Sequence, residues 1–147
     1  MPLRNVAEYL ERSAARVPDK TAFSDAAGAV SYRQMLHDAQ ALGTVLAGLA
    51  GWRNAPVAVM FGRTAVDVTA MEGVLQSGCY YVPIDEQMPE ARMRSILGQV
   101  HARAIVHTAA NEPQARALAD CAPLVSLEEA SQHTPDEALL RARREEI

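Results

Sequence analysis

Residues 75–85, Leu-Gln-Ser-Gly-Cys-Tyr-Tyr-Val-Pro-Ile-Asp, contain the end of one predicted element and the whole of the next. Gly78 fits the left-handed position that commonly closes a helix, so a helix is expected to end just before it. The apolar and aromatic run Cys79–Ile84 is typical of a strand, and Pro89 fits the first turn of another helix. A helix, a strand and a second helix in this order indicate a β-α-β arrangement.

The residues on both sides continue this alternation. Pro56–Phe61 is a continuous apolar run, which favours a strand buried on both faces of a parallel sheet. Further strands are expected at residues 104–108 and 124–127, and helices at residues 64–77, from 89, 111–119 and from 134. Strands that alternate with helices predict right-handed crossovers and a mostly parallel sheet with helices on both faces. The predicted fold class is therefore α/β.

The predicted helices have recognisable starts. Thr64 with Asp67 forms a capping box, Asn111 is a candidate cap, and Thr134-Pro135-Asp136-Glu137 combines a cap with a proline in the first turn. The alternating charges at residues 141–146 predict a solvated face on the last helix.

The first fifty residues predict a smaller unit beside the sheet. Asn5, with Glu8 as capping-box partner, is expected to open a helix that Pro18 closes. Residues 21–24 and 29–31 are predicted to form a hairpin around the turn signal at 25–28. Ser31, with Gln34, then opens a long amphipathic helix that ends near residue 50.

Composition limits the class of protein. The chain has 147 residues, the size of one domain spanning 1–147, and a formal net charge of −4. That charge argues against a nucleic-acid partner, which requires a basic face. No apolar run approaches the ~20 residues that span a bilayer, so no membrane association is expected. Cys79 and Cys121 form no disulfide framework, which favours a cytoplasmic location.

Ligands of open α/β sheets bind beyond the carboxyl ends of the strands. Here those ends are residues 61–64, 83–86 and 107–108. Gly62 and Arg63 precede a helix N-terminus, an arrangement that favours anions. The chain has neither G-x-G-x-x-G nor G-x-x-x-x-G-K-[ST], however, so an ordinary strand–helix turn is the preferred interpretation.

The remaining reactive side chains do not form a predicted site. Asp85 ends a strand, and its expected use is structural, either as a helix N-cap or in an ion pair with Arg92. The histidines, His37, His101, His107 and His133, share no metal-ligand spacing. Neither cysteine has an evident histidine partner for nucleophilic catalysis. We therefore assign no catalytic, cofactor-binding or metal-binding residue.

The stretch at 75–85 resembles the second core motif of the adenylate-forming enzymes. This family includes nonribosomal peptide synthetase adenylation domains, D-alanine–carrier protein ligases and acyl-CoA synthetases. Residues 30–35 resemble the first core motif, and residues 88–92 resemble the Tyr-Pro-x-x-Arg segment that follows the second. The match covers about residues 5–110, and the motif positions kept are Gly78, Tyr81, Pro83 and Asp85.

The resemblance carries implications for function. The Val-Pro-Ile-Asp ending is closer to the amino-acid-activating members than to the acyl-CoA synthetases. Such enzymes use ATP and Mg²⁺ to convert a carboxylate to an acyl adenylate, then pass the acyl group to a carrier-protein phosphopantetheine thiol or to CoA. The family's phosphate-binding loop, nucleotide contacts, specificity pocket and mobile lysine all follow the motifs seen here. The resemblance thus implies an N-terminal portion that is inactive without the remainder of the adenylation domain.

Two other interpretations stay open. One is a natural short, non-catalytic α/β module that binds a partner or forms a homodimer through an exposed sheet edge. The other, a small autonomous nucleotide-binding or redox protein, is disfavoured by the missing glycine-rich loop.

Overall fold

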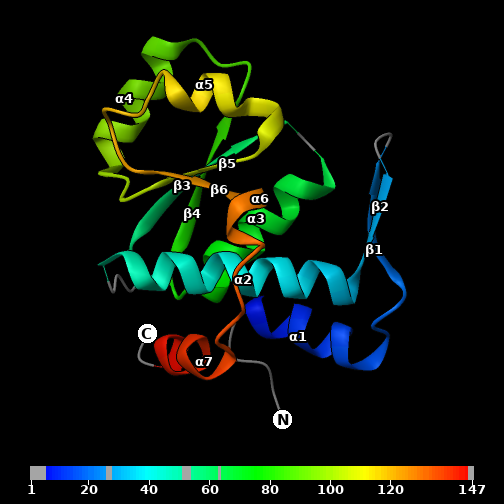
Figure 1. Cartoon of the computed structure of the whole chain (residues 1–147). Coiled ribbons are helices and arrows are strands. Elements are labelled where there is room, and N and C mark those ends of the chain that lie inside the picture. Colours follow the sequence, from blue (N-terminus) through cyan, green and yellow to red (C-terminus); the bar gives the residue numbers. More distant parts are fainter. Residues whose placement is uncertain (1–5, 26–27, 51–53, 63, 146–147) are drawn as a thin grey trace.

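The computed structural model describes residues 6–25, 28–50, 54–62 and 64–145. Its centre is a four-stranded sheet in the order β4-β3-β5-β6, and every neighbouring pair is parallel (Figure 1). The strands are β3 (Pro56–Phe61), β4 (Tyr80–Asp85), β5 (Ile105–His107) and β6 (Leu124–Ser126). The predicted α/β fold with a parallel sheet is confirmed. No described helix is long and apolar enough to cross a membrane.

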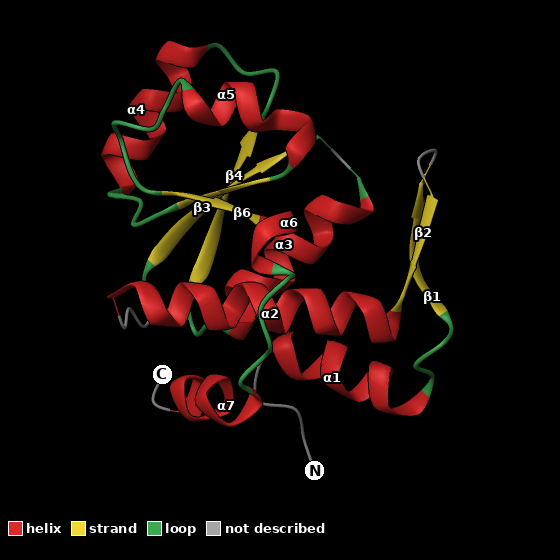
Figure 2. Cartoon of the chain, in the orientation of Figure 1, coloured by secondary structure: helices red, strands yellow, loops and turns green. Residues whose placement is uncertain are grey.

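Helices cover both faces of this sheet (Figure 2). One face carries α2 (Tyr32–Ala50), α3 (Ala65–Gln76) and the short α6 (Leu127–Ala130); the other carries α4 (Glu90–Val100) and α5 (Glu112–Arg116). Strand β3 is continuously apolar because its side chains are buried on both faces of the sheet. Val57 and Val59 enter the first apolar cluster, whereas Ala58 and Met60 enter the second, and all four are fully buried.

Helices α2 and α3 cross in close contact, and glycine permits it. A Cβ atom at Gly73 would lie 2.6 Å from Cδ2 and 2.9 Å from Cβ of Leu42, and 3.0 Å from the carbonyl oxygen of Ala39. A Cβ atom at Gly43 would lie 3.1 Å from Cβ of Gln76. The missing side chains thus let the two helices approach over the sheet.

The N-terminal residues form the predicted smaller unit. Helix α1 (Val6–Arg16) packs on α2 through a third apolar cluster that contains Leu10, Met35 and Ala39. Strands β1 (Thr21–Asp25) and β2 (Gly28–Ser31) pair antiparallel and project from the body as a hairpin (Figure 2). The expected cap Asn5 and the hairpin residues 26–27 lie outside the described residues.

Helix α7 (Glu137–Glu145) lies away from the sheet, beneath α2 in the view of Figure 1. Two of its residues correct the sequence prediction. Arg143 and Arg144 were expected on a solvated face, yet they are only 4% and 8% exposed. The physical reason is that both guanidinium groups donate to backbone carbonyls at the C-terminal end of α3, where the helix dipole favours positive charge.

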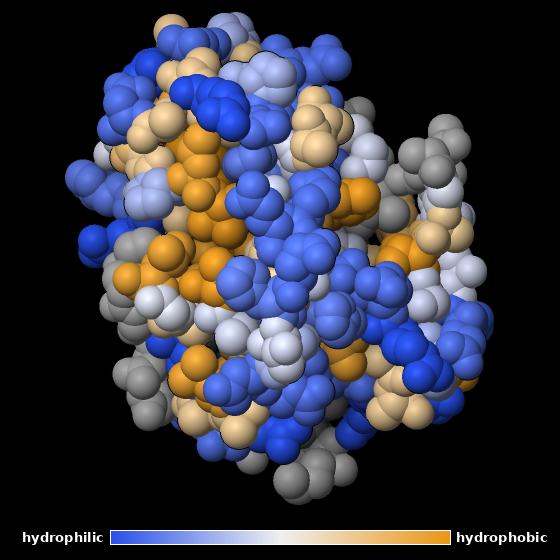
Figure 3. All heavy atoms as spheres, in the orientation of Figure 1, coloured by the Kyte–Doolittle hydropathy of each residue, from blue (hydrophilic) through white to orange (hydrophobic). Residues whose placement is uncertain are grey.

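Both edges of the sheet are open within the described residues, because β4 and β6 each pair on one side only. Figure 3 shows apolar surface continuing from the region of β6 to the C-terminal end of α2. Leu49, near that end of α2, is 47% exposed.

Several predicted local signals are confirmed. Thr64 and Asp67 form a reciprocal capping box at the start of α3. Ser31 Oγ accepts a hydrogen bond from the Gln34 amide at 3.2 Å. Gly78 has φ of +85°, the left-handed conformation expected after α3.

The predicted helix at 111–119 is only partly correct. A 3₁₀ turn, η1 (Ala109–Asn111), comes first, and α5 ends at Arg116. Asn111 occupies the N-cap position of α5, as predicted, but its side chain makes no capping hydrogen bond to that helix. Its side-chain oxygen instead accepts from the Thr108 amide at 2.9 Å and closes the preceding turn. Hydrogen bonds three residues apart then replace helical ones up to Cys121.

The last third differs from prediction in two further places. The sequence pattern did not indicate α6, a helix of four residues that Ser126 opens by accepting from the Glu129 amide at 3.3 Å. Helix α7 starts after Asp136 instead of Thr134, because Asp136 Oδ1 accepts from the Leu139 amide at 3.0 Å.

Candidate functional site

The carboxyl ends of β3, β4 and β5 lie at one edge of the sheet, as the parallel pairing requires. Phe61 lies opposite Asp85 in the register, and His107 ends the strand on the other side of β3. The structure therefore brings together the three segments that the sequence indicated.

The turn between β3 and α3 was the candidate anion site, and a protein carboxylate already fills it. Asp67 Oδ2 accepts from the Gly62 amide at 2.7 Å, and from the Thr64 amide and hydroxyl, both at 2.9 Å. Asp67 is only 2% exposed. These three donors of the turn are therefore already engaged by a carboxylate of the chain itself. Arg63 lies outside the described residues.

A second carboxylate lies against this turn. A Cβ atom at Gly62 would lie 2.5 Å from Oε1 of Glu86, so the carboxylate occupies the space that a side chain would take. The backbone of Glu86 is fixed beside β3, because its amide donates to the Phe61 carbonyl at 3.1 Å. Two acidic side chains at one turn disfavour an anionic ligand.

Asp85 has a structural role, as predicted, because it closes a turn. Within the described residues it is neither the helix N-cap nor the ion-pair partner of Arg92 that the sequence suggested. Its Oδ1 accepts from the Gln87 amide at 2.9 Å, and its carbonyl accepts from the Met88 amide at 3.0 Å. Pro89 is the residue that precedes α4, so Asp85 is not that helix's N-cap. Among the described ion pairs none joins Asp85 to Arg92.

The histidines lie apart. His107 is 5% exposed, and its Nδ1 lies 3.1 Å from the Thr108 carbonyl oxygen, so it is a satisfied buried residue. His37 contacts the carboxylate of Asp38 at 3.1 Å on the surface of α2. His101 has φ of +55° and closes α4. Within the described chain, no three His, Cys, Asp or Glu side chains are grouped so that they could hold a metal ion.

An open cavity of about 750 Å³ lies between α2 and the segment that leads into α7. Sequence reasoning missed it, because its two walls are about 100 residues apart in the chain and no motif links them. The charged groups at its rim are partly engaged: Arg33 pairs with Asp19 at 3.1 Å, and Asp136 caps α7. Its lining residues are Arg33, Leu36, His37, Gln40 and Thr134–Glu137.

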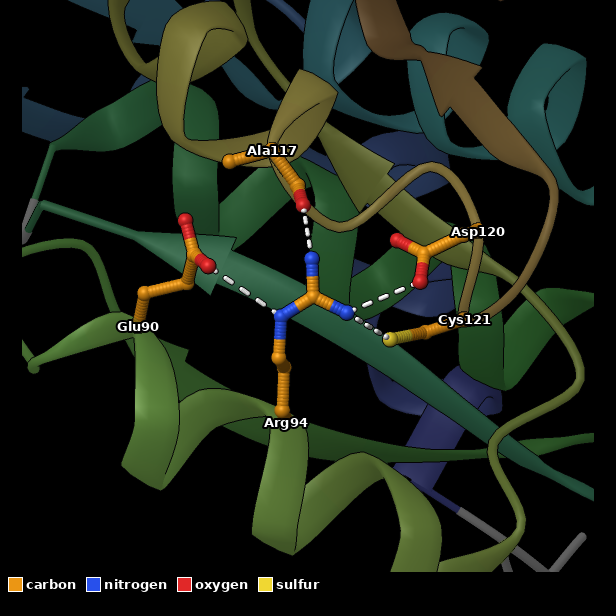
Figure 4. A network of polar contacts seen from close by, with 5 residues as sticks. All are labelled: Glu90, Arg94, Ala117, Asp120 and Cys121. Atoms are coloured by element: carbon orange, nitrogen blue, oxygen red, sulfur yellow. Dashed lines mark hydrogen bonds and ion pairs between the residues drawn. The ribbon is translucent and has the colours of Figure 1, made fainter.

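A polar network around Arg94 joins α4 to the loop before β6 (Figure 4). Its guanidinium donates to Asp120 Oδ2 at 2.9 Å, to the Ala117 carbonyl at 2.6 Å and to Glu90 Oε2 at 3.2 Å. The hydrogen bond from Arg94 lowers the pKa of Asp120 below its ordinary value of 3.8. Cys121 Sγ lies 3.6 Å from the same guanidinium. The network therefore holds α4 and the loop before β6 together.

Comparison with known proteins gives the family. The sequence profile of the family described as AMP-binding enzyme matches residues 10–146. Pyochelin synthetase PchF of Pseudomonas aeruginosa is 40% identical over 103 residues, which are 70% of this chain and 6% of that protein. The isonitrile lipopeptide synthase of Mycobacterium tuberculosis is 32% identical over 105 residues, 71% of this chain and 4% of the relative.

Solved structures agree on the fold. A benzoate CoA ligase from Burkholderia xenovorans superimposes with a TM-score of 0.79 at 23% identity, over 92% of this chain and 30% of that one. The nonribosomal peptide synthetase FmoA3 gives a TM-score of 0.78 at 19% identity, over 90% of this chain and 15% of the other. The chain thus spans a small share of the proteins it matches. The family profile, which covers nearly the whole sequence, shows that this chain belongs to the AMP-binding enzymes, the family of nonribosomal peptide synthetase adenylation domains.

Proposed function

We propose that this chain is the N-terminal portion of an ATP-dependent ligase that activates an amino acid, or another carboxylate, as an acyl adenylate. The whole enzyme would then transfer the acyl group to a carrier-protein thiol. The observation that carries this proposal is the 40% identity to a pyochelin synthetase, together with the family profile. ATP and Mg²⁺ would serve the whole enzyme, which we place in the cytoplasm.

By itself the chain is proposed to be catalytically inactive. The carboxyl-end turn that could have bound phosphate is filled by Asp67 and bordered by Glu86. The other side chains at this edge, Asp85 and His107, are engaged with backbone groups. Catalysis would therefore depend on residues supplied by the remainder of the adenylation domain, which is where the family resemblance implies that the nucleotide-binding segments lie.

The backbone pattern favours β6 as the edge where that remainder continues the sheet. The Tyr80 amide donates to Ala55 and the Glu86 amide to Phe61, which turns the even-numbered residues of β4 toward β3. Pro83 then faces the open edge, where it offers no N–H donor, a position that proline tolerates on terminal strands. Strand β6 contains no proline, so its outward-facing residues keep their N–H donors.

A second candidate is a short non-catalytic module that self-associates. The exposed apolar surface running from β6 to the end of α2 favours it, because contiguous apolar surface marks interaction sites (Figure 3). In this case the homodimer would bury that surface. It predicts a dimer by light scattering at micromolar concentration, whereas a monomer that captures no second copy would contradict it.

Amino-acid-dependent ATP–pyrophosphate exchange tests the leading proposal. The 147-residue chain and the longer polypeptide from the same gene are assayed side by side with a panel of amino acids and aryl acids. We expect exchange with the longer polypeptide and only background with the short chain. Substrate-dependent exchange by the short chain would overturn the claim of inactivity, and no exchange by the longer one with any substrate would overturn the ligase assignment.

A further inference from the structure

Helix α7 has a different kind of contact with the body from the other long helices. Leu140 is its one fully buried apolar side chain among the described residues, and it belongs to none of the three apolar clusters. It packs over Gly43, where a Cβ atom would lie 3.2 Å from Cδ2 of Leu140. Leu139, its neighbour, is 40% exposed. Burial of apolar surface therefore holds α7 weakly.

The other contacts of α7, with α1 and α3, are polar; we call the surface that α7 covers on α1, α2 and α3 its seat. Arg143 Nε donates to the Ser77 carbonyl at 2.9 Å, and Arg144 Nη1 donates to Gln76 Oε1 at 2.8 Å. Arg144 also pairs with Glu11 of α1. Two buried cations thus face a single carboxylate among the ion pairs of the described residues.

This polar seat is incompletely satisfied. Arg143 Nη2 and Arg144 Nε are buried and have no hydrogen-bond partner within the described chain. A buried donor without a partner gains a hydrogen bond when water reaches it. If α7 moved away from the body, hydration of these two donors would offset part of the free energy lost with the broken contacts. An element with few buried apolar contacts opens at lower free energy than a core element does.

The segment before α7 provides a pivot. The Asp136 amide donates to Thr44 Oγ1 of α2 at 2.9 Å, and the Asp136 side chain caps α7. Residues 132–134 are exposed and lie in no helix or strand. A rotation about residues 132–134 would break the Asp136–Thr44 hydrogen bond and lift α7 together with residues 135–137, while α2 and the sheet stay in place.

We propose that α7 is a strap, which opens from its seat on α1, α2 and α3 while the parallel sheet remains folded. In the closed position, α7 connects α1 with the part of the chain that follows β6. Opening frees two arginines and uncovers Gly43 on α2. It also widens the cavity between α2 and residues 134–137, since those residues form one wall.

Hydrogen exchange of the native chain, read by mass spectrometry in low urea, tests the strap. We expect α7 peptides to show protection factors roughly 100-fold below those of β3, with little dependence on urea because local opening exposes little surface. Labelling of the Cys79 thiol, buried in the sheet cluster, reports opening of the core independently. Equal protection in α7 and β3, with equal urea dependence, would overturn the proposal.

Two matched variants strengthen the experiment. Leu140→Ala removes the apolar contact of the strap, and Leu118→Ala removes an equally buried leucine from the cluster under α4. We expect Leu140→Ala to lower protection in α7 by a further factor of about ten while the Cys79 labelling rate stays unchanged. Leu118→Ala should accelerate Cys79 labelling. If Leu140→Ala accelerates Cys79 labelling as much as Leu118→Ala does, or unfolds the chain, α7 is part of the core and the proposal fails.

Discussion

Substitution of alanine for Gly73 tests the close crossing of α2 and α3. In most helices this change stabilises, because alanine is favoured over glycine by ~1 kcal/mol in a helix interior. At Gly73 the new methyl group would lie 2.6 Å from Cδ2 of Leu42 and 3.0 Å from the Ala39 carbonyl oxygen. The first distance is far below van der Waals contact, and the second, which involves backbone, is a few tenths of an ångström too short.

The magnitude follows from these two opposing effects. Overpacking a well-packed core costs ~1–3 kcal/mol, and here the fully buried Leu42 and the backbone of α2 must both shift. After the gain in helix propensity of ~1 kcal/mol, Gly73→Ala is expected to lower the free energy of unfolding by up to about 2 kcal/mol. For a domain of this size that corresponds to a fall in Tm of up to roughly 8 °C.

Gly98 supplies the matched control. It lies in α4, and a Cβ atom there would meet nothing within 4 Å, so Gly98→Ala should raise stability by ~0.5–1 kcal/mol. Urea denaturation followed by circular dichroism measures both variants against the parent chain. The reasoning would be refuted if Gly73→Ala were as stable as Gly98→Ala, because the crossing would then have room for a methyl group.

Other predictions concern single carboxylates. Asp67→Asn is expected to cost about 1–3 kcal/mol in urea denaturation, since the three donors of Gly62 and Thr64 lose a charged acceptor; an unchanged midpoint would contradict that role. Burial raises the pKa of Glu72 above its ordinary 4.5, so the folded chain binds this proton more tightly than the unfolded chain and stability falls as pH rises above 4.5. Glu72→Gln should therefore stabilise at pH 7 and lose that advantage near pH 4, and a constant difference across the two pH values would count against it. The pKa of Asp120, lowered by the Arg94 hydrogen bond, should return toward 3.8 in Arg94→Gln when carboxyl ¹³C shifts are titrated by NMR; no change would show that the ion pair is not populated in solution.

Local chemistry explains why much of the fold could be predicted. The capping box of Thr64 and Asp67, the Ser31 cap and the left-handed Gly78 each depend on residues within a few positions of one another. The continuously apolar β3 likewise reports its own burial on both faces. Such signals place elements and the parallel sheet, because they need no knowledge of distant partners.

The parts that could not be predicted depend on distant contacts. Arg143 and Arg144 follow the alternating charge pattern of a solvated helix, and only the C-terminal carbonyls of α3, more than sixty residues away, explain their burial. Asn111 stands at the predicted N-cap position of α5, but its side chain closes the preceding turn instead of capping that helix. At the candidate site, sequence places Gly62 beside a helix N-terminus, whereas the Glu86 carboxylate that borders it comes from another loop.

The size of the native polypeptide tests the central claim most directly. An antibody raised against this chain would be used on extracts of the source cells, with the purified 147-residue chain as the size standard. A band several times larger than 15.9 kDa is the predicted result, because the chain spans only 6% of the pyochelin synthetase and 30% of the benzoate CoA ligase that it matches. A single band at 15.9 kDa would contradict the account, since the cell would then make the short chain as a protein in its own right.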